Sequence, residues 1–517
     1  MRLKFDNRFV NELPGDQSGL LQSRLTPGAC WAAAHPTQVA KPRLLAYSRE
    51  VAELLDLQDE QIRSEEFLNA FSGNRLLPGM SPYAARYGGH QFGSWAGQLG
   101  DGRAISLGEA VNSRGQRWEL QLKGAGSTPY SRRADGRAVL RSSLREFLCS
   151  EAMHHLGIPT TRALSLIATG DPVVRDMFYD GNPIMEPGAI VCRVSNSFIR
   201  FGNFEILASY GERDLLKQLI SFTIDRDFPE IGMQSEDRYA TWFRTICERT
   251  ARLVVEWLRV GFVHGVMNTD NMSILGLTID YGPYGWVDNF DPGWTPNTTD
   301  ADWRRYALAN QPSIARWNLE RLAEALEAVF PSRSILDEGL AHFDEKLQGN
   351  LSSMLTAKFG LVRAEDEDAN LIEDAFELMH SASVDMTEFF RSLAKVKRHA
   401  PELSLLKIAF YKEDLYRDHE AKFDAWLKRY CARLSAQKDE DKERRLRMNA
   451  VNPRFVPRNY LAQQAIDAAM QNDMTVLEKL MEAARHPYDD DIPPELTAKR
   501  PDWALDKPGC SMLSCSS

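Results

Sequence analysis

Alternating apolar and polar positions predict two adjacent strands in the first quarter of the chain. Residues 103–111 (RAISLGEAV) and 117–124 (RWELQLKG) both alternate, and the polar segment NSRGQ between them contains a glycine. This pattern is typical of a β-hairpin with one buried face. In the second strand Leu120 and Leu122 fall on one face, whereas Gln121 and Lys123 fall on the other.

The following segments alternate between helical and strand patterns. Residues 138–157 carry apolar side chains at helical spacing and end at Gly157, with a proline two residues beyond, which predicts a capped helix containing Glu146. Residues 161–170 and 189–202 favour strands, and 238–261 predict a long amphipathic helix ending in glycine. Up to about residue 85 short helical patterns mix with Pro and Gly breaks, and from about 302 the pattern is mainly helical.

Length and composition limit the kinds of protein this chain can be. At 517 residues the chain is expected to fold into two or three packed lobes, and 43% apolar with 26% charged residues is typical of a globular protein. A net charge of −10 argues against a general nucleic-acid or membrane-surface binder, so an anion site has to be local. No run of 18 apolar residues and no targeting segment is visible, and we therefore expect a cytoplasmic protein.

A glycine-rich turn precedes the first predicted strand. The segment GQLGDGRA contains Gly97, Gly100 and Gly102, which let the backbone approach a ligand closely, and Arg103 can neutralise a phosphate. The turn fits neither a Walker loop nor a dinucleotide-binding fingerprint. A tight surface turn without a ligand remains the alternative interpretation.

Lys123 and Glu146 form the second candidate feature. A lysine between apolar strand residues needs a carboxylate or phosphate partner if it is buried. In protein kinases a strand lysine pairs with a helix glutamate and holds phosphates. A solvent-exposed lysine at a sheet edge and a surface glutamate are the alternative.

The segment HGVMNTDNMSILGLTIDYG concentrates metal-seeking oxygens after the long helix. Aligned with the kinase motif H-R-D-x-x-x-x-N, His264 matches the histidine and Asn271 the metal-binding asparagine, but Val266 stands where the catalytic base belongs. Asp270 is then the replacement carboxylate. Asp280, reached through a short predicted strand, matches the second metal-binding aspartate. An Asx-rich turn without a metal is the alternative.

Further arginines lie near these motifs. Arg193 and Arg200 fall seven residues apart in a segment predicted to be extended, which suggests that something anionic faces them. Arginines also crowd the loop and helix start around Asp135 and Gly136, and part of this run is expected to be a solvated face. These additional arginines are Arg132, Arg133, Arg137, Arg141 and Arg145.

Taken together, GQLGDGRA, ELQLKGAGSTPYSRRADGRAVLRSSLREFL, HGVMNTDNMSILG and the cysteine third from the end resemble the SelO (YdiU) family of protein adenylyltransferases over nearly the whole chain. The resemblance implies an α+β, protein kinase-like bilobal fold. Its expected parts are an N-terminal extension (1–85), an N-lobe (86–205), a C-lobe (206–330) and a helical C-terminal extension with a redox tail (331–517). It further implies a pseudokinase that binds ATP in a flipped orientation and transfers AMP to Ser, Thr or Tyr hydroxyls of proteins, with UMP transfer from UTP as a further activity.

The resemblance also implies roles for individual residues. Asp270 would accept the proton, Glu146 would pair with Lys123, and Asn271 and Asp280 would hold Mg²⁺ or Mn²⁺. The residues implied to contact ATP are Gly100, Gly102, Arg103, Lys123, Asp135, Gly136, Arg193, Arg200 and Asp280. Two rival hypotheses remain open: a kinase-type phosphotransferase that uses Asp270 as its base, and a catalytically inactive nucleotide-binding scaffold.

The cysteines do not form a metal or disulfide framework, because the seven are scattered and none forms CxxC. We expect most of them to be reduced core thiols, except Cys510 and Cys515 in a small-residue tail where little else could bury them. In animal members of the family the position of Cys515 is selenocysteine, which implies redox chemistry there. No cysteine lies between residues 248 and 430, so Cys510 is the nearest possible partner, and two inert tail thiols are the alternative.

Overall fold

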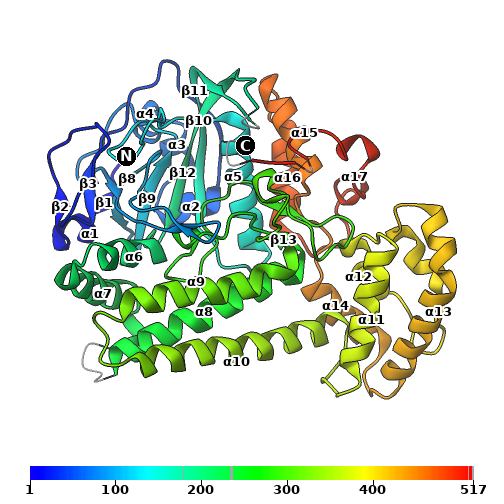
Figure 1. Cartoon of the computed structure of the whole chain (residues 1–517). Helices are drawn as coiled ribbons and strands as arrows, with labels where there is room; N and C mark the ends of the chain where they lie inside the picture. Colours follow the sequence, from blue (N-terminus) through cyan, green and yellow to red (C-terminus); the bar gives the residue numbers. More distant parts are fainter. Residues whose placement is uncertain (178–179, 233–236, 511, 515–517) are drawn as a thin grey trace.

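The protein is a mixed α/β structure in which helices pack around one large sheet (Figure 1). This computed structural model describes all residues except 178–179, 233–236, 511 and 515–517. The strands are β1 (Lys4–Phe5), β2 (Gly15–Asp16), β3 (Trp31–Ala33), β4 (Arg43–Tyr47), β5 (Tyr83–Ala85), β6 (His90–Gln91), β7 (Ser94–Trp95), β8 (Ala104–Val111), β9 (Arg117–Lys123), β10 (Ala138–Val139), β11 (Arg162–Arg175), β12 (Ile184–Ser195), β13 (Phe262–Val263) and β14 (Gly285–Trp286).

From about residue 302 onward the described elements are all helices, as the sequence predicted. The helices are α1 (Arg8–Glu12), α2 (Arg49–Leu54), α3 (Asp59–Ile62), α4 (Glu65–Phe71), α5 (Leu140–His155), α6 (Phe201–Ser209), α7 (Arg213–Asp227), α8 (Arg238–Val260), α9 (Gln311–Leu326), α10 (Arg333–Lys358), α11 (Asp368–Ser381), α12 (Met386–Leu393), α13 (Glu413–Ser435), α14 (Asp441–Val451), α15 (Asn459–Met470), α16 (Thr475–Arg485) and α17 (Pro494–Thr497). No described helix has the length and apolar character needed to cross a membrane.

The central sheet runs in the order β2-β3-β5-β8-β9-β12-β11-β4. The predicted hairpin is confirmed as β8 and β9, and β9 pairs antiparallel with β12 so that Gln121 lies opposite Arg193. The N-terminal segment adds strands that the sequence did not predict: β3 pairs with β5, and β4 pairs with the outer edge of β11. Strands of two to five residues are too short to leave a clear alternating pattern.

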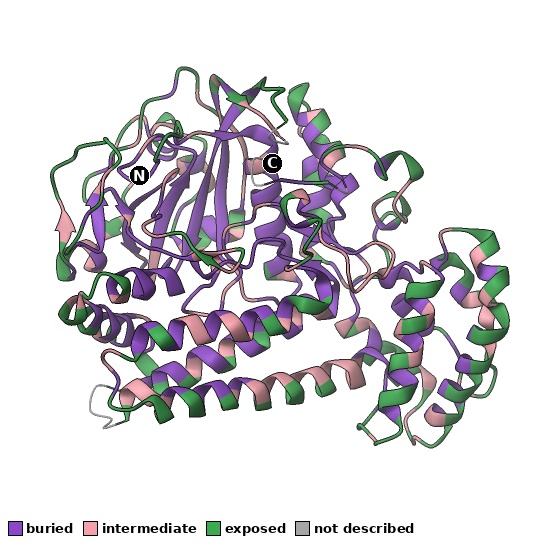
Figure 2. Ribbon diagram, viewed as in Figure 1, coloured by how far each residue is buried: buried purple, intermediate pink, exposed green. Residues whose placement is uncertain are grey.

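The two faces of the sheet pack against different partners, which is why its central strands β8, β9 and β12 are buried along most of their length (Figure 2). Leu120 and Leu122 pack with α2 and α4 in one hydrophobic cluster. On the other face, Val191 and side chains of α5 pack against α15 and α16. As predicted, Lys123 therefore lies on the face opposite the two leucines, where α5 can reach it.

Two predicted elements differ from the structure. The strand expected over 189–202 ends at Ser195, and Arg200 lies directly before α6, where its N–H donates to Oδ1 of Asn203 at 2.8 Å. This hydrogen bond favours a helix start over a continued strand. The short strand expected before Asp280 is likewise absent from the described residues, where Ser273 and Thr278 make only isolated bridges.

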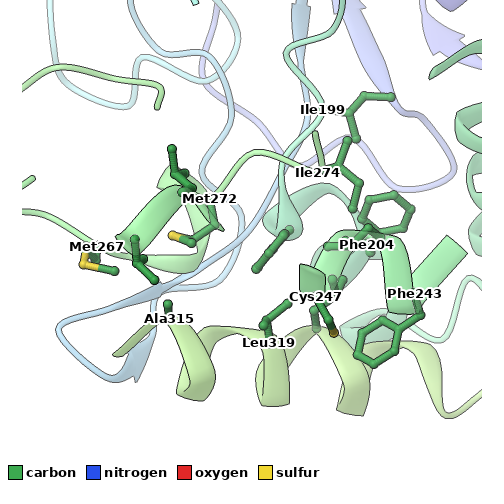
Figure 3. Close-up of a cluster of buried hydrophobic side chains, with 14 of the residues drawn as sticks. Ile199, Phe204, Phe243, Cys247, Met267, Met272, Ile274, Ala315 and Leu319 are labelled. Atoms are coloured by element: carbon green, nitrogen blue, oxygen red, sulfur yellow. The ribbon is translucent and has the colours of Figure 1, made fainter. Parts of the chain in front are cut away.

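The loop that contains Asp270 is anchored in the core of the helical layer formed by α8, α9 and α10. Met267 and Met272, which flank the loop, point into the cluster that Figure 3 shows, together with Cys247 of α8 and Leu319 of α9. Asn318 of α9 also donates to the carbonyl of Met267 at 2.9 Å. The loop between the methionines is thus fixed at both ends.

Candidate active site

The predicted motifs converge on a cavity of about 500 Å³. Its walls come from the glycine turn before β8, the end of β9, the loop 130–137, the ends of β11 and β12, and the loops 266–271 and 280–283. Among the residues that line it are Gly100, Gly102, Arg103, Lys123, Asp135, Gly136, Arg193, Val266, Asp270, Asn271 and Asp280.

The glycine turn owes its shape to close packing against a neighbouring segment. Gly100 has φ +95°, and a Cβ there would overlap the ring of Tyr130. A Cβ on Gly102 would lie 2.9 Å from the carbonyl oxygen of Tyr130. Both glycines line the cavity together with Arg103, whereas Gly97 is not part of its lining. Only the second half of the predicted motif therefore faces a possible ligand.

Lys123 and Glu146 form a buried ion pair with 2.7 Å between Nζ and Oε2. Lys123 is 8% and Glu146 2% exposed, so the alternative of a solvent-exposed pair is wrong. Burial lowers the pKa of the Lys123 ammonium, although Glu146 counteracts this effect. The ammonium is costly in this environment and gains from each additional anion.

Asp280 lies at the centre of a cluster of cations. Arg193 binds its Oδ1, Arg200 binds its Oδ2, and Nζ of Lys123 is 4.0 Å from Oδ1. Burial alone would raise the pKa of Asp280, but Arg200, Arg193 and Lys123 outweigh it and hold this pKa well below its usual range. The φ of Asp280 is +53°, a left-handed conformation that aspartate tolerates better than most residues.

The loop that begins at His264 is braced by its own hydrogen bonds. Nε2 of His264 donates to the carbonyl of Ile279 at 2.9 Å, and Nδ2 of Asn271 donates to the carbonyl of Val266 at 2.8 Å. Val266 and Asp270 both line the cavity. Burial raises the pKa of the Asp270 carboxyl to about 7, which is typical of a group that exchanges protons near neutral pH.

Asp135 and Gly136 lie at the mouth of the cavity beside a residue that the sequence did not indicate. Arg175, at the end of β11, binds both carboxylate oxygens of Asp135, at 2.8 and 2.6 Å. Gly136 has φ +68°, and a Cβ there would overlap the carbonyl of Gly126. A lone arginine forty residues beyond Asp135 gives no signal in the sequence.

Two arginines of the run near Asp135 are buried, so they are not part of a solvated face. Nε of Arg141 lies 2.6 Å from Glu186. Arg145 donates to the carbonyl of Tyr284 at 2.7 Å and stacks over its ring at 4.3 Å. Arg145 therefore braces the segment that follows Asp280.

A hairpin that sequence reasoning missed covers the Asp270 loop. Gln91 of β6 lines the cavity and donates through Nε2 to Oδ2 of Asp270 at 3.2 Å. Tyr87, just before the hairpin, stacks on the guanidinium of Arg200 at 4.6 Å. These residues carry no charge and lie outside the charged motifs, so nothing in the sequence marks them.

The cysteine tail is described only in part. Cys515 lies outside the described residues. Cys510 was expected to be poorly buried, but it is 3% exposed because the tail packs against α15, where Asn459 donates to the Cys510 carbonyl at 2.6 Å. The other five described cysteines are free and buried, as expected for core thiols. Further along the tail, the Leu513 carbonyl accepts the N–H of Thr298 at 2.8 Å.

The oxygens around the Asp270 loop fit a hard divalent cation. Oδ1 of Asp270 is buried without a hydrogen-bond partner. Asn271 uses its amide nitrogen for the loop, and its Oδ1 accepts no hydrogen bond from the described residues. The Asn271 amide oxygen and the Asp280 carboxylate are the oxygen type that Mg²⁺ and Mn²⁺ prefer, although both oxygens of Asp280 bind arginines in this structure.

One family model and several named relatives match this chain. The family model described as "Protein adenylyltransferase SelO" matches residues 25–485. The chain is 62% identical to "Protein nucleotidyltransferase YdiU" of Methylobacillus flagellatus over 517 residues, which are all of both chains. Proteins with the same description from Aromatoleum aromaticum and Tolumonas auensis are each 59% identical, over all of this chain and 99% of theirs.

Proposed function

The chain belongs to the SelO family of protein adenylyltransferases, and on that premise we propose that it transfers AMP from ATP to Ser, Thr or Tyr hydroxyls of other proteins. The same site would accept UTP and transfer UMP. One observation carries the proposal: Lys123, Arg193 and Arg200 surround Asp280, which lines the same cavity as Asp270 and the valine at the kinase base position. Arg200 itself is not part of the cavity lining and reaches the site through Asp280.

We propose a kinase-like, bilobal arrangement for this site. Residues 86–205 would form the lobe with the glycine turn and the Lys123–Glu146 pair, and 206–330 the lobe with the Asp270 and Asp280 loops. Residues 1–85 and 331–517 would be extensions of these lobes. The order glycine turn, lysine strand, glutamate helix and acidic loops supports this assignment.

The cations of the cavity are assigned to the triphosphate. The side chains joined by ion pairs are three cations (Lys123, Arg193 and Arg200) and two carboxylates (Glu146 and Asp280), so these contacts alone carry one excess positive charge. The buried Asp101 carboxyl, which also interacts with Arg200 and Arg193, offsets part of it. Burying an unmatched charge is costly, and a phosphate group would match it. Arg103 and the backbone at Gly100, Gly102 and Gly136, with Asp135 at the mouth, would complete the nucleotide site.

Asn271 and Asp280 would hold a divalent cation, Mg²⁺ or Mn²⁺. When bound, such an ion neutralises phosphate charge and polarises the reacting phosphoryl group. Arg193 and Arg200 bind Asp280 in this structure, and the phosphates of an incoming nucleotide would offer these arginines an alternative anion.

Asp270 would accept the proton of the acceptor hydroxyl. Its raised pKa and its position in the cavity lining support this role. The hydroxyl oxygen bonds to the α-phosphorus, the bond to pyrophosphate breaks, and the leaving electron pair remains on pyrophosphate. This reaction requires the α-phosphate, rather than the γ-phosphate, to lie beside Asp270. The flipped nucleotide orientation that the family resemblance implies would place it there.

Labelled ATP tests this function. The protein is incubated with a bacterial lysate, Mg²⁺ or Mn²⁺, and ATP labelled on either the α- or the γ-phosphate. We expect label to reach protein from the α-position only. Transfer from the γ-position alone would establish a phosphotransferase, and ATP binding without any transfer would establish a scaffold. Mass spectrometry of the labelled proteins then identifies AMP or UMP and the modified residue.

The role of the C-terminal tail is a separate proposal. We assign a redox role to Cys515, with Cys510 as its candidate partner. Burial raises the pKa of Cys510 to about 11, so in the described conformation its thiol is a poor nucleophile. Disulfide formation would therefore require the tail to leave α15.

A further inference from the structure

The hairpin of β6 and β7 is bound directly to the Asp270 loop. The N–H of His90 donates to Oγ1 of Thr269 at 2.7 Å, and the N–H of Phe92 donates to Oδ1 of Asn268 at 3.1 Å. Phe92 adopts φ +50°, an uncommon conformation for a large side chain, and the contacts with the loop hold it there. Hairpin and loop therefore behave as one unit.

Within this unit the Asp270 carboxylate is held from two sides. Oδ2 accepts the Gln91 side-chain N–H at 3.2 Å. Oδ1 is buried without a partner, and a Cβ built on Gly89 would lie 2.5 Å from it. Arg200 donates at 3.0 Å to the backbone carbonyl of Asp270. Among the described residues, Gln91 is thus the one side chain that hydrogen-bonds this carboxylate.

This arrangement determines which carboxylate oxygen can meet a substrate. Because Gly89 seals the side of Oδ1, Oδ2 is the oxygen available for reaction from the cavity that Gln91 and Asp270 both line. A carboxylate without an ion pair or hydrogen bond can rotate about its last torsion, which is broad and two-fold. The hydrogen bond from the Gln91 amide restricts this rotation.

We propose that Gln91 is a positioning residue of the transfer reaction, which presents Oδ2 of Asp270 to the acceptor hydroxyl. The inference rests on the proposed role of Asp270 as proton acceptor. The hydroxyl proton passes to Oδ2, which still has one lone pair free beside the hydrogen bond from Gln91. Gln91 itself exchanges no proton and forms no bond to the substrate.

The primary test replaces Gln91 with methionine, which keeps the size of the side chain and removes the donor. We expect kcat for α-label transfer to fall about tenfold to a hundredfold, as for the loss of a hydrogen bond to a charged group. The Kd of a non-hydrolysable ATP analogue, measured calorimetrically with Mg²⁺, stays within about twofold, since Gln91 hydrogen-bonds Asp270 and none of the cations assigned to the triphosphate. Ser94→Ala, an exposed change on the same hairpin, is the matched control and retains the parent kcat.

Two results would overturn the inference: an unchanged kcat in Gln91→Met, or a loss of kcat accompanied by an equal loss of ATP affinity, which would indicate general damage. Gly89→Ala provides a second approach, because its added methyl group pushes against Oδ1. It should lower kcat while leaving the Kd for the analogue unchanged.

A double-mutant cycle separates this inference from the proposed function. In an Asp270→Ala background Gln91→Met should cause no further loss of transfer, because no carboxylate remains to be positioned. A full additional loss would mean that Gln91 acts independently of Asp270. If Asp270→Ala alone retains full transfer, the role proposed for Asp270 fails. If its residual transfer is undetectable, the comparison of kcat and Kd in Gln91→Met decides the matter.

Discussion

Removing the charge of Lys123 and removing the charge of Glu146 should change the stability of the protein by very different amounts, although the two residues form one ion pair. The connected cluster around Asp280 carries a net charge of +1. Lys123→Met lowers this charge to zero, and Glu146 then still has Nη1 of Arg193 at 3.2 Å. Glu146→Gln raises the charge to +2 and leaves two buried cations with Asp280 as their remaining partner.

The expected magnitudes follow from this charge count. An uncompensated buried charge costs about 3–5 kcal/mol, so Glu146→Gln should lower the free energy of unfolding by about 3 kcal/mol or more. Lys123→Met should lower it by about 0–2 kcal/mol, because burial already disfavours the Lys123 ammonium. ATP affinity should nevertheless fall about tenfold to a hundredfold in Lys123→Met, through the loss of a charged hydrogen-bond donor.

Urea unfolding measures the stability of both variants, and calorimetry with the ATP analogue measures their affinity. Lys428→Met is the matched control, because its lysine pairs with Asp424 on an exposed helix face with 65% of the side chain accessible. It should change stability by less than about 0.5 kcal/mol. Equal destabilisation by Lys123→Met and Glu146→Gln would refute the charge count, and unchanged ATP affinity in Lys123→Met would remove this lysine from the nucleotide site.

Three further outcomes are expected. Gly136→Ala should weaken ATP affinity by about tenfold, because a β-carbon at this position overlaps the backbone of Gly126. Gly115 has a similar φ but open space around it, so Gly115→Ala should leave ATP affinity unchanged. Calorimetry with the ATP analogue compares the two variants. Burial lowers the pKa of His264, so as pH falls the unfolded chain binds a proton on this ring before the native state does, and stability should fall as pH decreases through this range. Nitrogen NMR should find that the folded ring is protonated at Nε2 and stays neutral to lower pH than the ring of the unfolded chain. Burial raises the pKa values of Cys149 and Cys192, so thiol reagents should modify them only after unfolding, and rapid labelling of the native protein would contradict their burial.

The sequence predicted the elements that have a strong period and the residues that carry charge. The hairpin of β8 and β9 and the long helix α8 were correct in type and position, since amphipathic patterns of that length are rarely ambiguous. The structure also brings Lys123 to Glu146 and Arg193 to Asp280, because charged residues within apolar segments have few alternatives to pairing.

The missed parts depend on contacts that leave no local pattern. Gln91 lies in a two-residue strand and gains its importance from Asp270, 179 residues away. Arg175 likewise reaches Asp135 only because of its position at the end of β11, which the sequence does not reveal. Uncharged polar residues and single arginines are common in any sequence, so neither Gln91 nor Arg175 stands out before the fold is known.

Arg200 was predicted as a site residue, but it was assigned to a strand that in the structure ends before it. In one continuous strand Arg193 and Arg200, seven positions apart, would point to opposite faces of the sheet and could not share an anion. The chain leaves β12 at Ser195, and the turn before α6 brings Arg200 to the oxygen of Asp280 that Arg193 leaves open. The break in the strand is therefore what concentrates both guanidinium groups on one carboxylate. It also produces the excess positive charge that we assign to the triphosphate.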